Sequence, residues 1–252
     1  MWLKLKRLIG KQFNKRFKVK SAEISKIIGY VNHDYDVAFK FLPKCGSTSV
    51  LRMLYEVENG VPFDPKLGGK LHQWGRKKKF APTSNISRRI VIIREPVKRF
   101  LSAYTNRVNE KQQLSKEFVE KNNPHVFSEI PYFNPTIEQF IDEFEIYRKV
   151  HQIGHHTKPI CDFLKPWSLD SFTDVIPMEK ISMIEDVISD IYNCEAVLGH
   201  HQVTKDEKKI RLSDISESHL YKIMDFYSED YKYLSDYYTE DNIIHEWMAE
   251  NK

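Results

Sequence analysis

The chain has 252 residues, of which 41% are hydrophobic and 13% aromatic, and its formal net charge at pH 7 is +4. This length and composition are typical of a soluble globular protein with one large α/β domain or two small ones. The charge is too small and too dispersed to indicate nucleic-acid binding by itself. No segment approaches the roughly 18 unbroken apolar residues of a membrane-spanning helix.

Residues 1–33 begin with the basic stretch MWLKLKRLIGKQFNKRFKVK, which lacks the apolar block and cleavage site of a secretory signal. This segment is either a solvated basic arm or a short amphipathic helix that makes peripheral contact with an anionic membrane. The three cysteines, Cys45, Cys161 and Cys194, have no CxxC spacing and favour a reducing compartment. We therefore expect a cytoplasmic location.

The first informative unit is a strand followed by a polar turn and a helix. Residues 36–42, DVAFKFL, alternate in the manner of a mostly buried strand. After Pro43, a helix that begins near Ser47–Ser49 would place Val50, Leu51, Leu54 and Tyr55 on one face. Ser47, Thr48 and Ser49 are good N-cap residues, and Gly46 lets backbone amides approach an anion.

A second unit of the same kind follows at residues 88–108. The apolar run 90–93 suits the centre of a parallel sheet, Arg94 stands at its carboxyl end, and Pro96 is well placed to start a helix. Open α/β sheets bind ligands outside the carboxyl ends of their strands. We therefore expect Lys44 and its hydroxyl cluster to share one crevice with Arg94 and Ser102, whose side chains suit a single phosphate.

The lysine of the first turn precedes its only glycine, unlike the GxxxxGK[ST] frame of nucleotide triphosphatases. A P-loop kinase also needs an aspartate for Mg²⁺ at the end of an apolar strand, where this chain has Arg94. The sequence therefore disfavours a kinase or NTPase.

Both turns resemble those of a known family. PKCGSTS (43–49) is similar to the 5′-phosphosulfate loop of sulfotransferases, and VIIREPVKRFLSAY (91–104) is similar to their 3′-phosphate element. Together they resemble the carbohydrate sulfotransferases of the heparan 2-O, chondroitin and HNK-1 types. Weaker similarities are GHHTKPICDFL (154–164), with Ile160 where the family has Gln, VIPMEKI (175–181) and FYSEDYKYLSDY (226–237).

The resemblance covers residues 34–238 and implies a single-domain α/β sulfotransferase fold with a P-loop-like central parallel sheet flanked by helices. Residues 34–252 then form the domain, with an insertion or lid at 109–135. The implied donor is 3′-phosphoadenosine 5′-phosphosulfate, used without a metal. Since the full-length Golgi enzymes of the family carry a membrane anchor, we expect either a bacterial or phage-type cytoplasmic enzyme or a trimmed chain.

The same resemblance implies the roles of the two turns. Lys44 would neutralise the leaving phosphate, while Arg94 and Ser102 would hold the 3′-phosphate. The 5′-phosphate would lie on the turn itself, formed by residues Cys45, Gly46, Ser47, Thr48 and Ser49.

Sulfuryl transfer to a sugar hydroxyl also needs a general base. His72, in a glycine-flanked segment between the two units, is the candidate, and the family's glycan 2-O-sulfotransferases carry their catalytic histidine in a comparable place. His156, Glu56 and Glu58 are alternatives, and His156 could instead shape the donor or acceptor pocket.

The acceptor is expected to be a glycan or glycolipid, with no nucleic-acid partner. Arg76 and Lys77, in the run GRKKKF, are candidate contacts for an acidic glycan, although such a run is more often a solvated face. The aromatic C-terminus (Tyr227, Tyr231, Tyr233, Tyr237, Tyr238 and Trp247) is better explained by core packing than by stacking on sugars. The pairs His155–His156 and His200–His201 lack further ligands at metal spacing, so no metal is assigned.

Two other functions remain open. The acceptor could be a protein tyrosine, a lipid or a small molecule, and the chain could be a non-catalytic glycan-binding or membrane-associated scaffold. Binding of the 3′-phosphorylated nucleotide separates a scaffold from an enzyme.

Overall fold

The structure is a computed structural model that describes residues 29–64, 66, 70–75, 85–199 and 209–252. Its centre is a four-stranded sheet in the order β1–β2–β3–β4. The strands are β1 (Tyr30–Asn32), β2 (Val37–Lys40), β3 (Arg88–Ile93) and β4 (Asp174–Pro177). β1 pairs antiparallel with β2, and the other neighbours are parallel. The predicted α/β class is confirmed. The first strand, β1, lies before residue 34, the predicted start of the domain.

Helices flank this sheet as a single domain. The α-helices of the described segments are α2 (Ser47–Asn59), α3 (Lys70–Gly75), α4 (Pro96–Tyr104), α5 (Lys116–Asn122), α6 (Ile137–Asp142), α7 (Phe144–Tyr147), α8 (His151–Thr157), α9 (Ile160–Leu164), α10 (Met183–Tyr192), α11 (Glu217–Phe226), α12 (Ser228–Tyr233) and α13 (Glu240–Glu250). A π-helix, η2 (Thr105–Glu110), continues α4, and the 3₁₀ turns are η3 (Pro124–Glu129), η4 (Leu169–Ser171), η5 (Met178–Lys180) and η7 (Leu212–Asp214). None of the helices in the described segments is long and apolar enough to cross a membrane.

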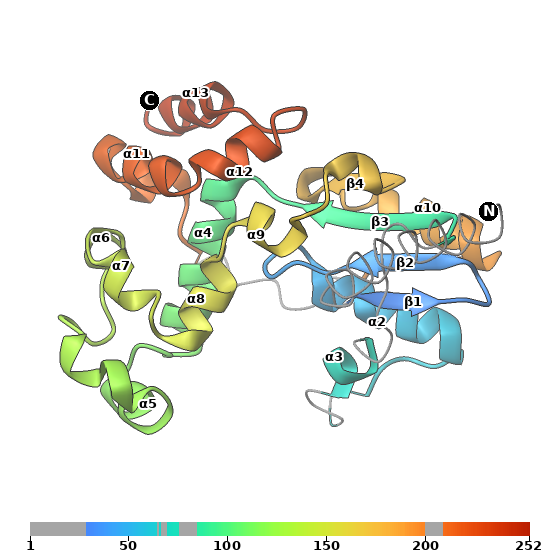
Figure 1. Ribbon diagram of the computed structural model, residues 1–252, viewed down its shortest axis with the longest axis horizontal. Coiled ribbons are helices and arrows are strands. Elements are labelled where there is room, and N and C mark those ends of the chain that lie inside the picture. Colours follow the sequence, from blue (N-terminus) through green and yellow to red (C-terminus); the bar gives the residue numbers. More distant parts are fainter. Residues whose placement is uncertain (1–28, 65, 67–69, 76–84, 200–208) are drawn as a thin grey trace, which may run out of the picture.

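The two strand–turn–helix units form as predicted. Residues 90–93 are buried in β3, and α4 begins at Pro96, in the first turn where proline's missing N–H costs nothing. β2 and β3 point toward the middle of the molecule, with α4, α8 and α9 beyond their carboxyl ends and α2 beside β1 and β2 (Figure 1). The fold thus places both polar turns at one edge of the sheet.

The segment 109–135, predicted as an insertion or lid, is a small helical lobe. It contains the end of η2 together with α5 and η3, and it buries Leu114, Val119, Val126 and Ile130. Within this segment, which the structure describes completely, Lys111 lines the cavity described below. Whether the lobe acts as a lid stays a prediction.

The aromatic side chains of the C-terminal region mostly pack inside the protein. Tyr227, Tyr231 and Tyr238 are buried, and Trp247 packs against the core while its indole N–H donates to the Ile215 carbonyl at 3.0 Å. Core packing, the favoured interpretation of this region, is confirmed for these residues.

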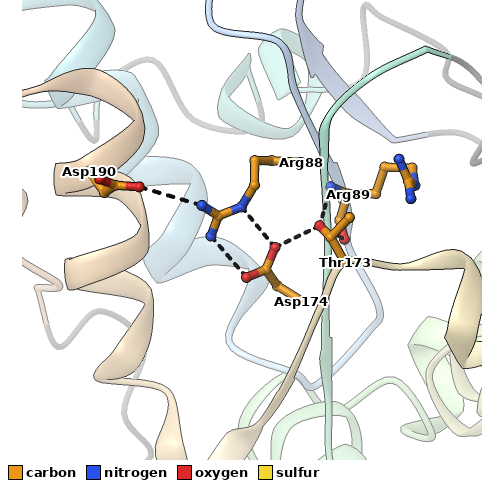
Figure 2. Close-up of polar contacts among 5 residues, drawn as sticks. All are labelled: Arg88, Arg89, Thr173, Asp174 and Asp190. Atoms are coloured by element: carbon orange, nitrogen blue, oxygen red, sulfur yellow. Dashed lines mark hydrogen bonds and ion pairs between the residues drawn. The ribbon is translucent and has the colours of Figure 1, made fainter.

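A polar cluster joins the amino ends of β3 and β4 (Figure 2). Arg88 donates twice to Asp174, from Nε to Oδ2 at 3.0 Å and from Nη2 to Oδ1 at 2.9 Å. Its Nη1 lies 3.4 Å from Oδ2 of Asp190 on α10. The paired geometry and partial burial favour the first contact over the second.

We expect Asp174→Asn to lower the free energy of unfolding by about 1–2 kcal/mol, because it weakens a half-buried, bidentate charge pair. Asp190→Asn is the matched control, and since its side chain is 78% exposed the change should stay within about 0.5 kcal/mol. Urea titrations of the two variants give both values. Equal effects would show that the bidentate contact has no special weight.

Candidate functional site

A cavity of about 1630 Å³ lies at the carboxyl ends of β2 and β3. It is lined by nearly all of the predicted site residues that the structure describes: Lys44, Gly46, Ser47, Thr48, Ser49, His72, Arg94, Ser102 and His156. Cys45 is the exception, because its side chain is buried. Arg76 and Lys77 lie outside the described residues. Sequence segments far apart therefore converge on one basic cavity.

The turn between β2 and α2 presents a helix N-terminus to this cavity. Lys44 and Gly46 both have left-handed backbones, with φ angles of 66° and 67°. At Gly46 a Cβ would also lie 2.4 Å from Ile181 Cδ1, so glycine suits both the conformation and the close approach. The turn can then place the first residues of α2 against the cavity, where the positive end of the helix favours an anion.

The predicted capping of α2 is wrong in detail. The N-cap is Gly46, and Ser47, Thr48 and Ser49 are the first three helical residues. The cap makes no side-chain hydrogen bond, and the first turn has no acidic residue. The three hydroxyl residues line the cavity, where they can contribute to binding a ligand.

Lys44 is a partly buried cation among other cations. Burial, together with the positive charges of Arg107 and Arg94, lowers its pKa to about 8, while Glu110 acts in the opposite direction. Lys40, which also lines the cavity, has its pKa lowered to about 8 by burial and by Lys158. Such a cluster of positive charge is relieved when an anion binds.

Arg94 ties the second turn to the first. Its Nη1 donates to the Lys44 carbonyl oxygen at 3.1 Å, while its guanidinium also lines the cavity. Burial lowers the pKa of Arg94, and the nearby Cys45, Glu179 and Glu95 oppose that shift. Arg94 therefore has two effects that an experiment must separate: it contacts the cavity, and it holds the Lys44 backbone.

The residue after Arg94 fixes the start of α4. Glu95 is buried, and its Oε2 accepts from the Lys98 backbone N–H at 2.7 Å as the helix cap. Its other oxygen accepts from the Tyr231 hydroxyl on α12. Burial raises the pKa of Glu95, although both of these hydrogen bonds oppose the shift. This anchoring holds the turn that carries Arg94.

Several structural residues of the site were missed by the sequence analysis. Arg99 is fully buried and donates to the carbonyl oxygens of His156 (3.2 Å), Thr157 (3.5 Å) and Lys158 (2.6 Å). Asp230, also fully buried, accepts from the backbone N–H groups of Ile160 (2.7 Å) and Cys161 (2.8 Å). The charged positions inside the similarities at 91–104 and 226–237 were the available signal. These side chains hold the α8–α9 turn against the cavity.

His72 lies in α3, a short helix within the glycine-flanked segment. Its Nε2 is 3.4 Å from Thr48 Oγ1 at the first turn of α2. The neighbouring Gly75 lets α3 approach α2 closely, because a Cβ there would lie 2.3 Å from Leu51 Cδ2. The packing of two helices, and not a flexible segment, therefore places His72 at the cavity.

The alternative bases are less well placed. Glu58 accepts from the Tyr192 hydroxyl at 2.7 Å and from the Asn32 amide, in contacts with β1 and α10, and neither Glu56 nor Glu58 lines the cavity. His156 lines it, but its Nε2 lies 2.5 Å from Nη2 of Arg107 and its Nδ1 lies 2.8 Å from the Gln152 carbonyl oxygen. Both ring nitrogens are engaged, which disfavours His156 as the base.

Within the described ranges, no group of three or more His, Cys, Asp or Glu side chains could hold a metal ion. His155 lies on the cavity wall, with its ring against Phe163 at a centroid distance of 5.7 Å. His200 and His201 lie outside the described residues. The positive side chains described above are instead the groups that can bind an anionic ligand.

Comparison with known proteins identifies the family of the chain. No curated protein and no solved structure matches the chain significantly. The profile of the sulfotransferase family matches residues 30–238, which include the sheet, both polar turns and the α8–α9 turn. Since this match covers most of the sequence, the chain belongs to the sulfotransferase family.

Proposed function

We propose that the protein transfers the sulfuryl group of 3′-phosphoadenosine 5′-phosphosulfate to a hydroxyl group of a carbohydrate. One observation carries the proposal. Two cations, Lys44 and Arg94, and the hydroxyl residues next to them line one cavity at the carboxyl ends of adjacent parallel strands. Family membership supports the sulfuryl transfer, and the arrangement of these side chains supports the donor.

The residues present fit a donor with two separate phosphate groups. The uncapped N-terminus of α2 suits the 5′-phosphate, because backbone amides and the helix dipole favour an anion there. Arg94 and Ser102 suit the 3′-phosphate, since a guanidinium and a hydroxyl can donate to the same group. Lys44 would then be left for the bridging oxygen between phosphorus and sulfur.

The transfer itself needs alignment and charge stabilisation more than covalent participation by the protein. The acceptor oxygen forms a bond to sulfur as the bond from sulfur to the bridging oxygen breaks. The leaving 5′-phosphate keeps the electron pair, which the Lys44 ammonium stabilises. His72 takes the proton of the acceptor hydroxyl. This assignment of His72 is supported by its place on the cavity wall beside Thr48.

The size and polarity of the cavity favour a large polar acceptor. Its volume of about 1630 Å³ exceeds the roughly 300–1,000 Å³ of common small-ligand sites, which leaves room for a second substrate beside a nucleotide. Lys111, Lys158 and Arg211 also line it. A carbohydrate with anionic groups would match such a wall, whereas a tyrosine peptide or an apolar small molecule would leave this charge unused.

The donor assignment predicts that Arg94→Ala weakens binding of 3′,5′-bisphosphoadenosine by roughly 10- to 150-fold, because a charge-assisted hydrogen bond to the 3′-phosphate is lost. Adenosine 5′-monophosphate, which lacks that phosphate, should lose much less affinity. Isothermal titration calorimetry of both nucleotides with the wild type and with Arg94→Ala gives the four affinities that this comparison needs. An equal loss for the two nucleotides would show that Arg94 acts only through the Lys44 backbone, and it would contradict the 3′-phosphate assignment.

A further inference from the structure

Arg107 lies at the cavity and was not among the predicted site residues. It belongs to the π-helix η2, which continues α4 without a break. Three consecutive residues of η2, Thr105, Asn106 and Arg107, line the cavity. In a regular α-helix, residues that share a face are three or four positions apart. A π-helical turn holds more residues than an α-helical turn, so consecutive side chains spread less around the axis, and this helps Arg107 to face the cavity with the two residues before it.

His156 holds Arg107 as a neutral hydrogen-bond acceptor. Its Nδ1 hydrogen donates to the Gln152 carbonyl oxygen at 2.8 Å, which leaves Nε2 to accept from Arg107 Nη2 at 2.5 Å. Burial and the charge of Arg107 lower the pKa of His156 to about 3. The imidazole is therefore neutral near pH 7. A neutral ring can accept from a guanidinium, whereas a protonated one would repel it.

The guanidinium of Arg107 has an unsatisfied donor. Its Nε is buried and has no hydrogen-bond partner in the described part of the chain. Burial lowers the pKa of Arg107 and Glu110 opposes that shift, but the exposed Glu110 side chain accepts from Asn106 Nδ2 at 2.6 Å. Among the neighbouring charges, the positive charge of Arg107 lowers the pKa of Lys44 the most, and both side chains line the same cavity.

We propose that Arg107 binds the oxygens of the sulfuryl group during its transfer and that His156 is the positioning residue that orients it. This inference rests on the proposed function. There, the helix N-terminus binds the 5′-phosphate, Arg94 and Ser102 bind the 3′-phosphate, and Lys44 serves the bridging oxygen. The sulfuryl oxygens are the remaining negative group, and the planar fork of an arginine beside Lys44 matches them.

The test compares Arg107→Ala, Arg107→Lys, His156→Ala and His156→Gln, with the exposed Lys116→Ala on α5 as the control for loss of one positive charge. Two quantities are measured: the affinity for 3′,5′-bisphosphoadenosine, which has no sulfuryl group, and the turnover of radiolabelled donor onto its best acceptor or onto water. Arg107→Ala should lower turnover on the order of 10²-fold, the usual effect of losing a donor to a developing charge. Its affinity for the bisphosphate should change less than about threefold, which also shows that the variant is folded.

The His156 variants separate positioning from a general structural role. His156→Ala should lower turnover by about tenfold, because it removes an acceptor from a charged donor. His156→Gln should recover most of that loss, since the Gln carbonyl oxygen can accept from Arg107, and it should keep the pH–rate profile of the wild type. Arg107→Lys should stay impaired because an ammonium has no fork.

Three results would overturn this inference. Normal turnover in Arg107→Ala would remove its role, while a matching loss of bisphosphate affinity would place Arg107 on a phosphate and not on the sulfuryl group. Equal loss in His156→Ala and His156→Gln would deny the positioning role. If the unmodified protein does not bind the bisphosphate, the proposed function itself is wrong and this assignment is wrong with it.

Discussion

Lys44→Met should lower turnover by about 10²–10³-fold, because it removes the cation that stabilises the leaving phosphate as the sulfur–oxygen bond breaks. Methionine keeps an unbranched apolar stem of similar length, so the loss reports on charge more than on packing. The same variant should melt at or above the wild-type temperature. Burial lowers the pKa of Lys44 to about 8, which means that the folded protein holds this cation at a cost near neutral pH.

The pH dependence of donor binding gives this prediction a second measurement. In the free protein Lys44 loses its proton as the pH rises through about 8, and the neutral amine attracts an anion less. Affinity for 3′,5′-bisphosphoadenosine should therefore fall above pH 8, and binding at pH 9 should take up protons, because the bound phosphates raise the pKa of Lys44. Calorimetry in two buffers of different ionisation enthalpy measures that uptake.

Lys44→Met should reduce the proton uptake without abolishing it, because the pKa of Lys40 in the same cavity is also about 8. Lys121→Ala, on the exposed end of α5, is the control for net charge. Unchanged turnover in Lys44→Met, or proton uptake equal to that of the wild type, would contradict the role of Lys44.

His72→Ala should lower turnover by roughly 10²–10⁴-fold while leaving bisphosphate affinity within a few-fold of the wild type, since a general base acts on the acceptor and not on the nucleotide. The acid limb of the pH–rate profile should flatten in this variant, because a base must be neutral to accept a proton. Steady-state rates from pH 5 to 8 and calorimetry at neutral pH give the two results.

Chemical rescue separates a base from a structural contact at His72. In His72→Gly the cavity should admit free imidazole, and added imidazole should restore part of the rate. Thr48→Val measures the effect of losing the contact alone, because it removes the Thr48 hydroxyl, 3.4 Å from His72 Nε2, and keeps the imidazole. Loss of bisphosphate affinity in His72→Ala, with no rescue of His72→Gly by imidazole, would instead show that His72 stabilises the turn between β2 and α2.

The sequence allowed prediction of the parts of the site that local patterns determine. Two patterns identified both turns and the edge of the sheet where they meet. They are the apolar run of β3 followed by Arg94, and the hydroxyl cluster that follows β2 in the sequence. Pro96 marked the start of α4 correctly because its fixed φ and missing N–H suit a first turn.

What failed depended on backbone geometry or on contacts between distant segments. The hydroxyl residues were good candidates for the N-cap, but the left-handed turn at Lys44 and Gly46 moved the cap to the glycine. Glu58 was a candidate base because it ends the same helix, yet its carboxylate is engaged by the Tyr192 hydroxyl, and no local pattern reveals that contact.

The role of His156 shows the same limit. Its place in a short motif suggested a base or a pocket residue, whereas the structure shows its Nε2 against Arg107, which lies in η2, far from His156 in the sequence. A π-helical turn such as η2 has no clear sequence signature, so Arg107 could not be placed at the cavity from periodicity. Only the folded chain brings the two side chains together.

The most direct test of the account is transfer of radiolabelled sulfate from 3′-phosphoadenosine 5′-phosphosulfate onto a panel of glycans, glycolipids, tyrosine peptides and small phenols, in the presence of a chelator. We predict label on at least one carbohydrate, at a rate that the chelator does not change. Lys44→Met and His72→Ala should each lower that rate to about 1% of the wild-type rate or less. Label only on peptides or phenols would contradict the carbohydrate acceptor. No transfer to any acceptor, together with no preference for the 3′-phosphorylated nucleotide in binding, would contradict the central claim.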